Sequence, residues 1–174
     1  FLKHKYNRKN FLSDIETLKN IKGIIFRNKD KIIKNIPGEI IKDLDFLPLP
    51  ARDLFPVERY IPLPNQYKKL PLANMLVIRG CPYVCTFCDQ AATTARRRSP
   101  QKVIEEIKDV VDKYGVKEIS FWDDTMSYHK KWMKEFCTLL IEAKLNVIWS
   151  CYAAVNTVNQ EILYLMKKAG CWNI

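Results

Sequence analysis

Three cysteines lie close together in the run Arg79-Gly80-Cys81-Pro82-Tyr83-Val84-Cys85-Thr86-Phe87-Cys88. Their spacing is C-x3-C-x2-C, with an aromatic residue directly before the third cysteine. Three thiolates on one short loop are soft ligands that can hold three corners of an iron–sulfur cube. The motif has no fourth cysteine, so one iron would stay open to a ligand that is not protein. An open coordination position distinguishes a catalytic metal site from a closed structural one.

Other chemistry for these cysteines stays open at this point. Structural zinc usually takes four ligands, often as two C-x2-C pairs, and neither His4 nor His129 is close in sequence. Disulfides fit the spacing poorly, and we see no secretory signal pattern, so we expect a reducing, cytoplasmic location. The remaining cysteines, Cys137, Cys151 and Cys171, stand apart, and we expect buried, inert thiols there.

The chain is basic, but its charge is unevenly distributed. Its 174 residues carry 29 Lys and Arg against 19 Asp and Glu, a formal net charge of +10. Residues 1–70 contribute +7 and residues 71–174 only +3. For the one compact basic run, Arg96-Arg97-Arg98, a solvated face or an anion contact is the usual interpretation. We find no nucleic-acid motif and no apolar stretch near the ~20 residues that cross a bilayer, so we expect neither nucleic acid nor a transmembrane segment.

The first 70 residues differ in kind from the rest. Residues 24–27 and 31–34 flank Asn28-Lys29-Asp30, a pattern that predicts a β-hairpin. After the hairpin come prolines, which exclude regular helix and central strand: Pro37, Pro48, Pro50, Pro56, Pro62, Pro64 and Pro71. We therefore expect an extended connector that packs along a neighbouring domain.

From residue 71 onward, apolar strands alternate with amphipathic helices. Strands are expected over residues 72–78, 116–122 and 146–152, and a fourth begins at residue 171. Helix signals lie between them: a Ser-Pro start and a glycine stop for the first, an apolar stripe in the second, and an asparagine cap for the third. This alternation predicts an α/β fold with a parallel sheet and right-handed crossovers.

The polar features follow the strand ends. The cysteine loop follows the first strand, Asp123-Asp124-Thr125 the second, and Ser150-Cys151-Tyr152 the third. Because the carboxyl ends of parallel strands meet at one edge of a sheet, we expect one site at this rim. A solvated turn is an equally good interpretation of the two aspartates, since Asp is common in turns.

Several blocks of the sequence resemble the radical-SAM superfamily. Residues 81–88 are similar to its signature motif. Residues 41–53 are similar to the connector of the branch that has an N-terminal cobalamin-binding domain. Further blocks that resemble this branch are residues 98–107, 121–126 and 165–172. The resemblance covers about residues 20–174, and the cysteine motif is its most specific part.

For the fold, the resemblance implies a partial parallel (β/α) barrel with outer helices. Residues 71–174 would be the N-terminal half of the radical-SAM core domain, truncated after about three βα units. Residues 1–70 would be the tail of a cobalamin-binding domain followed by the Pro-rich connector. We therefore expect this chain to be a fragment of an enzyme, inactive by itself.

For the chemistry, the resemblance implies that Cys81, Cys85 and Cys88 each bind one iron of a [4Fe-4S] cluster. S-adenosyl-L-methionine (AdoMet) would chelate the fourth iron, and its reductive cleavage would give a 5'-deoxyadenosyl radical. Phe87 would lie near the adenine. The segment of Asp123, Asp124 and Thr125 would lie near the AdoMet amino group.

The reaction itself is expected to be cobalamin-linked methyl transfer or rearrangement of a small-molecule or lipid-like substrate, with an electron donor such as flavodoxin or ferredoxin. The chain has no D-x-H-x-x-G motif, so cobalamin would need an upstream domain. Ala154 and Asn156 stand where family members often have Arg and Asp. Three alternatives remain: a non-catalytic iron–sulfur electron-transfer module, a methylthio-transferring enzyme that modifies RNA, and a basic RNA-binding domain.

Overall fold

The computed structural model describes residues 14–56 and 59–174. The chain divides into two compact units between Lys42 and Asp43. All the predicted site residues belong to the second unit. The predicted assignment of residues 1–70 to the tail of a cobalamin-binding domain and a connector stays a prediction.

The first unit contains the predicted hairpin. Strands β1 (Ile25–Asn28) and β2 (Lys31–Lys34) pair antiparallel, after a short helix α2 (Ile15–Lys19). The side-chain amide of Asn35 donates to two carbonyl oxygens in and just after α2, at 2.7 and 2.6 Å. These bonds fasten the hairpin to the helix, and the hairpin prediction is confirmed.

The second unit is built on a four-stranded sheet in which every neighbouring pair is parallel. The strand order follows the sequence: β3 (Leu72–Met75), β6 (Glu118–Phe121), β7 (Ile148–Ser150) and β8 (Cys171–Asn173). The parallel α/β arrangement predicted from the alternating pattern is confirmed, as is the fourth strand. The second and third strands are shorter than the predicted ranges.

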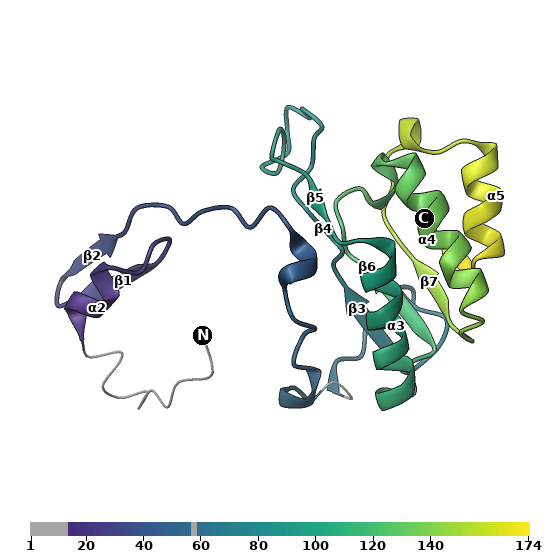
Figure 1. Ribbon diagram of the computed structural model, residues 1–174, viewed down its shortest axis with the longest axis horizontal. Coiled ribbons are helices and arrows are strands. Elements are labelled where there is room, and N and C mark those ends of the chain that lie inside the picture. Colours follow the sequence, from purple (N-terminus) through teal and green to yellow (C-terminus); the bar gives the residue numbers. More distant parts are fainter. Residues whose placement is uncertain (1–13, 57–58) are drawn as a thin grey trace. The chain divides into compact units, whose positions relative to one another are not determined.

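A helix follows each of the first three strands of this sheet: α3 (Pro100–Tyr114), α4 (Lys130–Glu142) and α5 (Gln160–Lys168). Figure 1 shows the three helices side by side over one face of the sheet. Such crossovers cover parallel strands that would otherwise expose apolar side chains. None of the helices in the described ranges is both long enough and apolar enough to cross a membrane.

Aromatic rings form the centre of the core between the sheet and the helices. Phe121 and Trp149 of the sheet meet Phe136 of α4 edge to face, with ring centroids 5.5–5.8 Å apart. Trp132, one turn earlier on α4, stacks on Phe136 at 5.4 Å. Such pairs add about 0.5–1.5 kcal/mol each beyond the area that they bury. This cluster fixes α4 over the middle of the sheet.

The helix ends follow the predicted signals. The hydroxyl of Ser99 accepts from the amide of Lys102 at 3.3 Å, and Pro100 fills the first turn of α3. Gly115 ends this helix with a φ of 62°, in the left-handed region that glycine adopts at least cost. At the start of α5, Asn159 caps in the same way as Ser99.

The connector that leads to β3 is extended, as its prolines predicted. Its described residues include the 3-10 turns η1 (Leu44–Phe46) and η2 (Arg52–Leu54) before the sheet begins. The carboxylate of Asp45 accepts from the amide of Ser99 at 2.9 Å, which ties η1 to the start of α3. The part of the connector from Asp43 onward therefore packs on the sheet domain as part of the same unit.

The first strand differs from the prediction, because the expected strand over residues 72–78 is broken. β3 ends at Met75, and β4 (Ile78–Arg79) pairs antiparallel with β5 (Arg96–Arg97) instead. The physical reason is a side chain that replaces the ladder: the carboxylate of Asp123 accepts from the amides of Val77 and Ile78, at 2.8 and 2.6 Å. An apolar run cannot reveal such a partner.

Glu118 ties three parts of the domain together at the start of β6. Its carboxyl group is fully buried, and one oxygen accepts from the amides of Lys68 and Lys69 at 2.8 and 2.7 Å. The other oxygen accepts from the indole nitrogen of Trp172 in β8, at 3.0 Å. The end of the connector, the second strand and the fourth strand thus share one carboxylate.

We expect Glu118→Ala to lower the free energy of unfolding by about 3 kcal/mol, because three donors lose an acceptor that is fully buried. Chemical denaturation followed by circular dichroism measures the change. Glu105→Ala, which removes an exposed carboxylate of α3, is the control and should change stability by less than about 0.5 kcal/mol. Equal effects of the two substitutions would contradict the anchoring role.

Candidate functional site

The three cysteines lie on the loop between β4 and β5. The pairing of Ile78 with Arg97 and of Arg79 with Arg96 closes the base of this loop. Figure 1 shows the loop projecting beyond the end of the sheet. It follows the first parallel strand, at the carboxyl edge where the sequence placed the site.

Thr93 holds the two sides of the cysteine loop together. Its hydroxyl accepts from the amide of Cys81 at 2.8 Å and donates to the carbonyl of Gln90 at 2.8 Å, while its own amide donates to the carbonyl of Cys81 at 3.0 Å. One step further along, the amide of Ala92 donates to the carbonyl of Tyr83 at 2.7 Å. Sequence reasoning missed Thr93, because nothing local marks a hydroxyl twelve residues away as the partner.

Gly80 lets the two sides of the loop approach closely. Its φ is +83°, and a Cβ added there would lie 2.5 Å from the carbonyl oxygen of Thr94. Any side chain would therefore combine an unfavourable backbone conformation with a collision against backbone. The glycine before the first cysteine is required by this geometry.

The thiols differ in exposure: Cys81 is buried, whereas Cys85 and Cys88 are exposed, and all three are free. Within residues 14–56 and 59–174, no group of three or more His, Cys, Asp or Glu side chains is placed to hold a metal ion. The structure thus puts the three cysteines on one loop without bringing their sulfurs to a common point. The donor set itself fits an iron–sulfur cluster, because it offers three soft thiols with none spent in a disulfide. Their role as ligands stays a prediction.

Asp123 lies at the point where β6 ends and is only 1% exposed. One carboxylate oxygen binds the two amides that lead into the cysteine loop, and the other is buried without a hydrogen-bond partner among the described residues. Burial raises the pKa of this carboxyl group to about 6, against the lowering effect of the amides. Asp123 is therefore a positioning residue for the loop, and its predicted proximity to AdoMet stays a prediction.

Three further residues were predicted to contact the cofactor: Asp124 and Thr125, directly after Asp123, and Phe87 on the cysteine loop. Thr125 is buried and donates from its hydroxyl to the carbonyl of Asp124 at 2.6 Å, while Asp124 itself is exposed. Phe87, on the cysteine loop, is 91% exposed. The predicted cofactor contacts of Phe87, Asp124 and Thr125 stay predictions.

The ends of β6 and β7 meet at the expected rim. The amide of Met126 donates to the carbonyl of Tyr152 at 3.0 Å, and the hydroxyls of Ser127 and Thr157 share a hydrogen bond. The rings of Trp122 and Tyr152 lie 5.7 Å apart, and both are about half exposed. Sequence reasoning did not select this aromatic pair, although its position directly after two strands was a usable signal.

The position where the family often has Asp lies in a short turn of the same rim. Asn156 belongs to η5 (Val155–Thr157), and the amide of Thr157 donates to the carbonyl of Ala154 at 2.9 Å. A backbone bond therefore shapes this segment, in which Ala154 and Asn156 replace the Arg and Asp that family members often carry.

The remaining cysteines behave largely as expected. Cys137 and Cys151 are buried, and Cys171 is partly buried. Burial raises the pKa of the Cys137 thiol to about 12. A hydrogen bond with the Cys171 sulfur, together with burial, raises the pKa of Cys151. The first two are thus neutral thiols at physiological pH, unsuited as ligands without metal-driven deprotonation.

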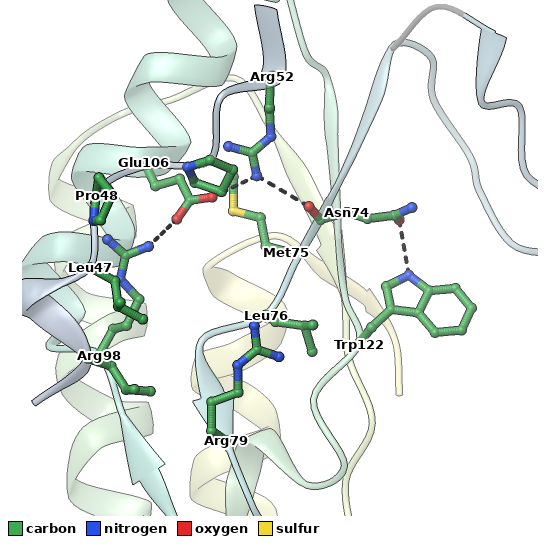
Figure 2. A pocket seen from close by; sticks show the side chains of 12 residues that line it. Leu47, Pro48, Arg52, Asn74, Met75, Leu76, Arg79, Arg98, Glu106 and Trp122 are labelled. Carbon is green, nitrogen blue, oxygen red and sulfur yellow. Dashed lines mark hydrogen bonds and ion pairs between the residues drawn. The ribbon is translucent and has the colours of Figure 1, made fainter. Parts of the chain in front are cut away.

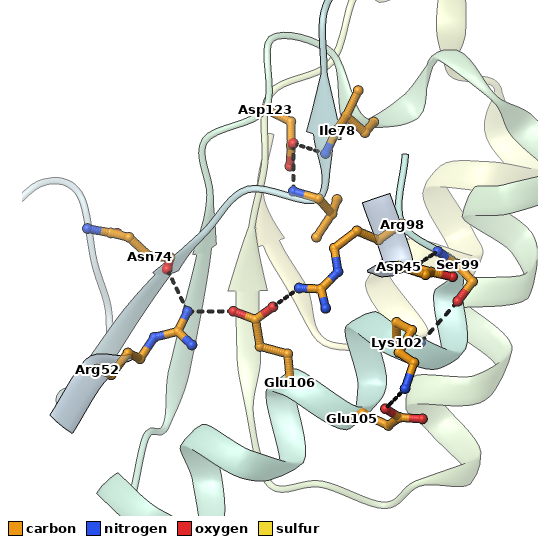
Figure 3. A network of polar contacts seen from close by, with 11 residues as sticks. Asp45, Arg52, Asn74, Ile78, Arg98, Ser99, Lys102, Glu105, Glu106 and Asp123 are labelled. Atoms are coloured by element: carbon orange, nitrogen blue, oxygen red, sulfur yellow. Dashed lines mark hydrogen bonds and ion pairs between the residues drawn. The ribbon is translucent and has the colours of Figure 1, made fainter. Parts of the chain in front are cut away.

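Arg98 of the basic run does not belong to a solvated face, because it is 7% exposed and contacts an anionic group within the protein, the carboxylate of Glu106. The other oxygen of Glu106 binds Arg52 at 2.6 Å, and Arg52 also donates to the carbonyl of Asn74 at 3.3 Å. Figure 3 shows these contacts as one network that joins the connector, β3 and α3. The sequence could not reveal it, since Arg52 and Glu106 lie 54 positions apart.

Comparison with protein families gives a match to the Radical SAM superfamily over residues 75–174. An uncharacterized methyltransferase of Pyrococcus horikoshii, PH0819, is 31% identical over 94% of this chain and 35% of its own length. The anaerobic magnesium-protoporphyrin IX monomethyl ester cyclase of Rubrivivax gelatinosus is 32% identical over 86% of this chain and 27% of its own. The chain spans about a third of the length of these curated relatives.

Among solved structures, the fold is similar to that of the radical S-adenosylmethionine methyltransferase TsrM from Kitasatospora setae. With tryptophan substrate and a SAM analog bound, TsrM matches 93% of this chain and 33% of its own with a TM-score of 0.65, at 15% identity. A second TsrM structure, with cobalamin and a [4Fe-4S] cluster, matches 57% of this chain and 21% of its own with a TM-score of 0.53, at 19% identity.

We expect Gly80→Ala to lose most of its capacity to take up iron, because the added Cβ displaces the strand that closes the cysteine loop. Iron and sulfide content after anaerobic reconstitution of the full-length protein measures the effect. Gly115→Ala is the matched control: it also has a positive φ, but no atom lies within 4 Å of the added Cβ. This control should lose about 1 kcal/mol of stability and bind iron normally. Equal iron content in both variants would contradict the close-approach argument.

Asp123 predicts a pH dependence of stability. Its pKa of about 6 in the folded protein exceeds the ordinary 3.8, so the folded state keeps the proton longer as pH rises. Below about pH 3.8, Asp123 contributes roughly 2–3 kcal/mol to the free energy of unfolding. This contribution falls as the pH rises from 3.8 to about 6 and is lost at higher pH. Asp123→Asn keeps one oxygen acceptor but does not titrate. Its unfolding temperature relative to the wild type should therefore rise between pH 4 and pH 6.5, as measured by thermal unfolding. The control Asp124→Asn should show no such rise. A stability difference between Asp123→Asn and the wild type that does not change with pH would refute the raised pKa of Asp123.

Proposed function

Because the chain belongs to the radical SAM superfamily, we propose that the protein containing it cleaves AdoMet reductively at a [4Fe-4S] cluster held by Cys81, Cys85 and Cys88. The observation that carries this proposal is a loop with three free thiols at the carboxyl end of the first strand of a parallel sheet. When bound, the cluster supplies the electron that breaks the carbon–sulfur bond of AdoMet, giving methionine and a 5'-deoxyadenosyl radical.

The residues of the chain have three tasks in this proposal. The cysteines hold three irons and leave one for AdoMet. Asp123 fixes the segment that leads into the cysteine loop, through two backbone amides. Phe87 covers the adenine of AdoMet. Its phenyl ring is 91% exposed beside the cysteines, so stacking on a flat ring would bury apolar surface that is now in water.

We further propose that the reaction is methyl transfer that uses cobalamin from a domain upstream of this chain. The relatives support this class, since PH0819 is described as a methyltransferase and TsrM as a methyltransferase with cobalamin and a [4Fe-4S] cluster bound. A small-molecule or lipid-like substrate and an external reductant, such as flavodoxin or ferredoxin, complete the proposal. Rearrangement is the second candidate, since the cyclase relative shows that the family likeness extends beyond methyltransferases.

The test is anaerobic reconstitution of the full-length protein with iron and sulfide. We expect about four irons per chain. Replacing Cys81, Cys85 or Cys88 by Ala should remove the cluster, whereas Cys137→Ala, which deletes a buried thiol of the core, should leave it intact. In the reduced protein, AdoMet should change the electron paramagnetic resonance spectrum, and dithionite should then yield 5'-deoxyadenosine.

Two outcomes would overturn parts of the proposal. A full cluster in Cys85→Ala would refute the ligand assignment. A spectrum unchanged by saturating AdoMet would favour a non-catalytic electron-transfer module, because such a module leaves no iron open to the cofactor.

A further inference from the structure

A cavity of about 510 Å³ lies between the connector and β3, apart from the thiols. Leu47 and Pro48 of the connector line one side, and Leu76 and Trp122 line the other. Figure 2 shows the guanidinium groups of Arg52, Arg79 and Arg98 arranged around the same space. The cavity is therefore apolar on its walls and basic at several points of its rim.

The charges that line this cavity do not cancel. Arg52 and Arg98 share a single carboxylate, that of Glu106, and both oxygens of that carboxylate are taken. Arg98 and Glu106 are 7% and 3% exposed, so this imbalance is largely removed from water. Arg79 adds a third positive charge at the exposed end of the cavity. A buried excess of positive charge is costly unless an anion compensates it.

Two donors of this network have no partner. Among the residues that the structure describes, Nη1 of Arg52 and Nε of Arg98 are buried without a hydrogen bond. Buried polar groups are nearly always satisfied in native proteins, so two unsatisfied guanidinium donors in residues that line the same cavity point to a missing acceptor. A guanidinium group presents its donors in a planar fork that matches carboxylate and phosphate oxygens.

We propose that this cavity binds the oxyanion of a small organic acid that has an apolar body. The carboxylate or phosphate group accepts from Arg52, Arg98 and Arg79, and the apolar part lies against the connector and Trp122. Both head groups share this chemistry, and the experiment below separates them. The proposal does not depend on the cluster, since none of the three cysteines lines the cavity.

The experiment is isothermal titration calorimetry of the full-length protein with octanoate, octyl phosphate and the uncharged octanol. We expect one of the two anions to bind about tenfold or more tightly than octanol, the effect of a charge-assisted hydrogen bond, and the better anion identifies the head group. Arg79→Gln and Arg98→Gln should each weaken that anion about tenfold. Arg79 is exposed, so its variant remains informative if loss of the buried Arg98 unfolds the protein.

The matched control is Arg96→Gln, which removes the same charge from the residue paired with Arg79 across the β4–β5 ladder but outside the cavity. It should bind the anion as the wild type does. The Cys85→Ala variant should also bind normally, which separates failure of this proposal from failure of the proposed function. Equal affinity for octanol and the anions, no binding of any probe, or equal losses in Arg79→Gln and Arg96→Gln would overturn the proposal.

Discussion

The backbone amides of Val77 and Ile78 leave the sheet to donate to one buried carboxylate, that of Asp123. A chain that continued straight as β3 would keep the following residues in the ladder. Because the carboxylate takes both amides, the chain turns instead into β4, and Gly80 then opens the loop that carries the cysteines. The position of Asp123 is fixed in turn by β6, which ends two residues earlier, at Phe121. One side chain, two residues after the second strand, thus sets where the first strand ends and where the cysteine loop begins.

Acidic side chains also hold the connector against the sheet domain. Asp45 accepts from an amide at the start of α3, Glu106 binds the guanidinium of Arg52, and Glu118 accepts from two amides directly before β3. Side-chain carboxylates thus make the contacts here, because proline-rich backbone cannot form a regular ladder. Three carboxylates, of which those of Glu106 and Glu118 are buried, therefore fasten a segment without regular helix or strand to the sheet domain at three separate points.

The sequence was sufficient for features that depend on local pattern. The Ser99–Pro100 start and Gly115 stop of α3, the hairpin, the proline-rich connector and the strand–helix alternation all follow from residue types a few positions apart, and the structure contains them. The break after Met75 did not follow, because it depends on a carboxylate more than forty residues away. The same reason hid the burial of Arg98, whose basic neighbours made it look like part of a solvated face. Long-range polar contacts carry no local signature, so the sequence located the rim of the site but not the network beneath it.

The cysteine loop shows how these constraints bear on the chemistry. Cys81 is held at the base by bonds from both its amide and its carbonyl to Thr93, whereas Cys85 and Cys88 are exposed, joined by a single turn bond of 3.1 Å. The protein fold thus fixes the position of Cys81 through several bonds, whereas Cys85 and Cys88 are held far less. Metal binding commonly completes the ordering of its own site, and its free energy then appears as folding free energy of that segment. The fold thus supplies the fixed end of the loop, through Asp123, Gly80 and Thr93, and the proposed cluster would have to bring the other two thiols to the first.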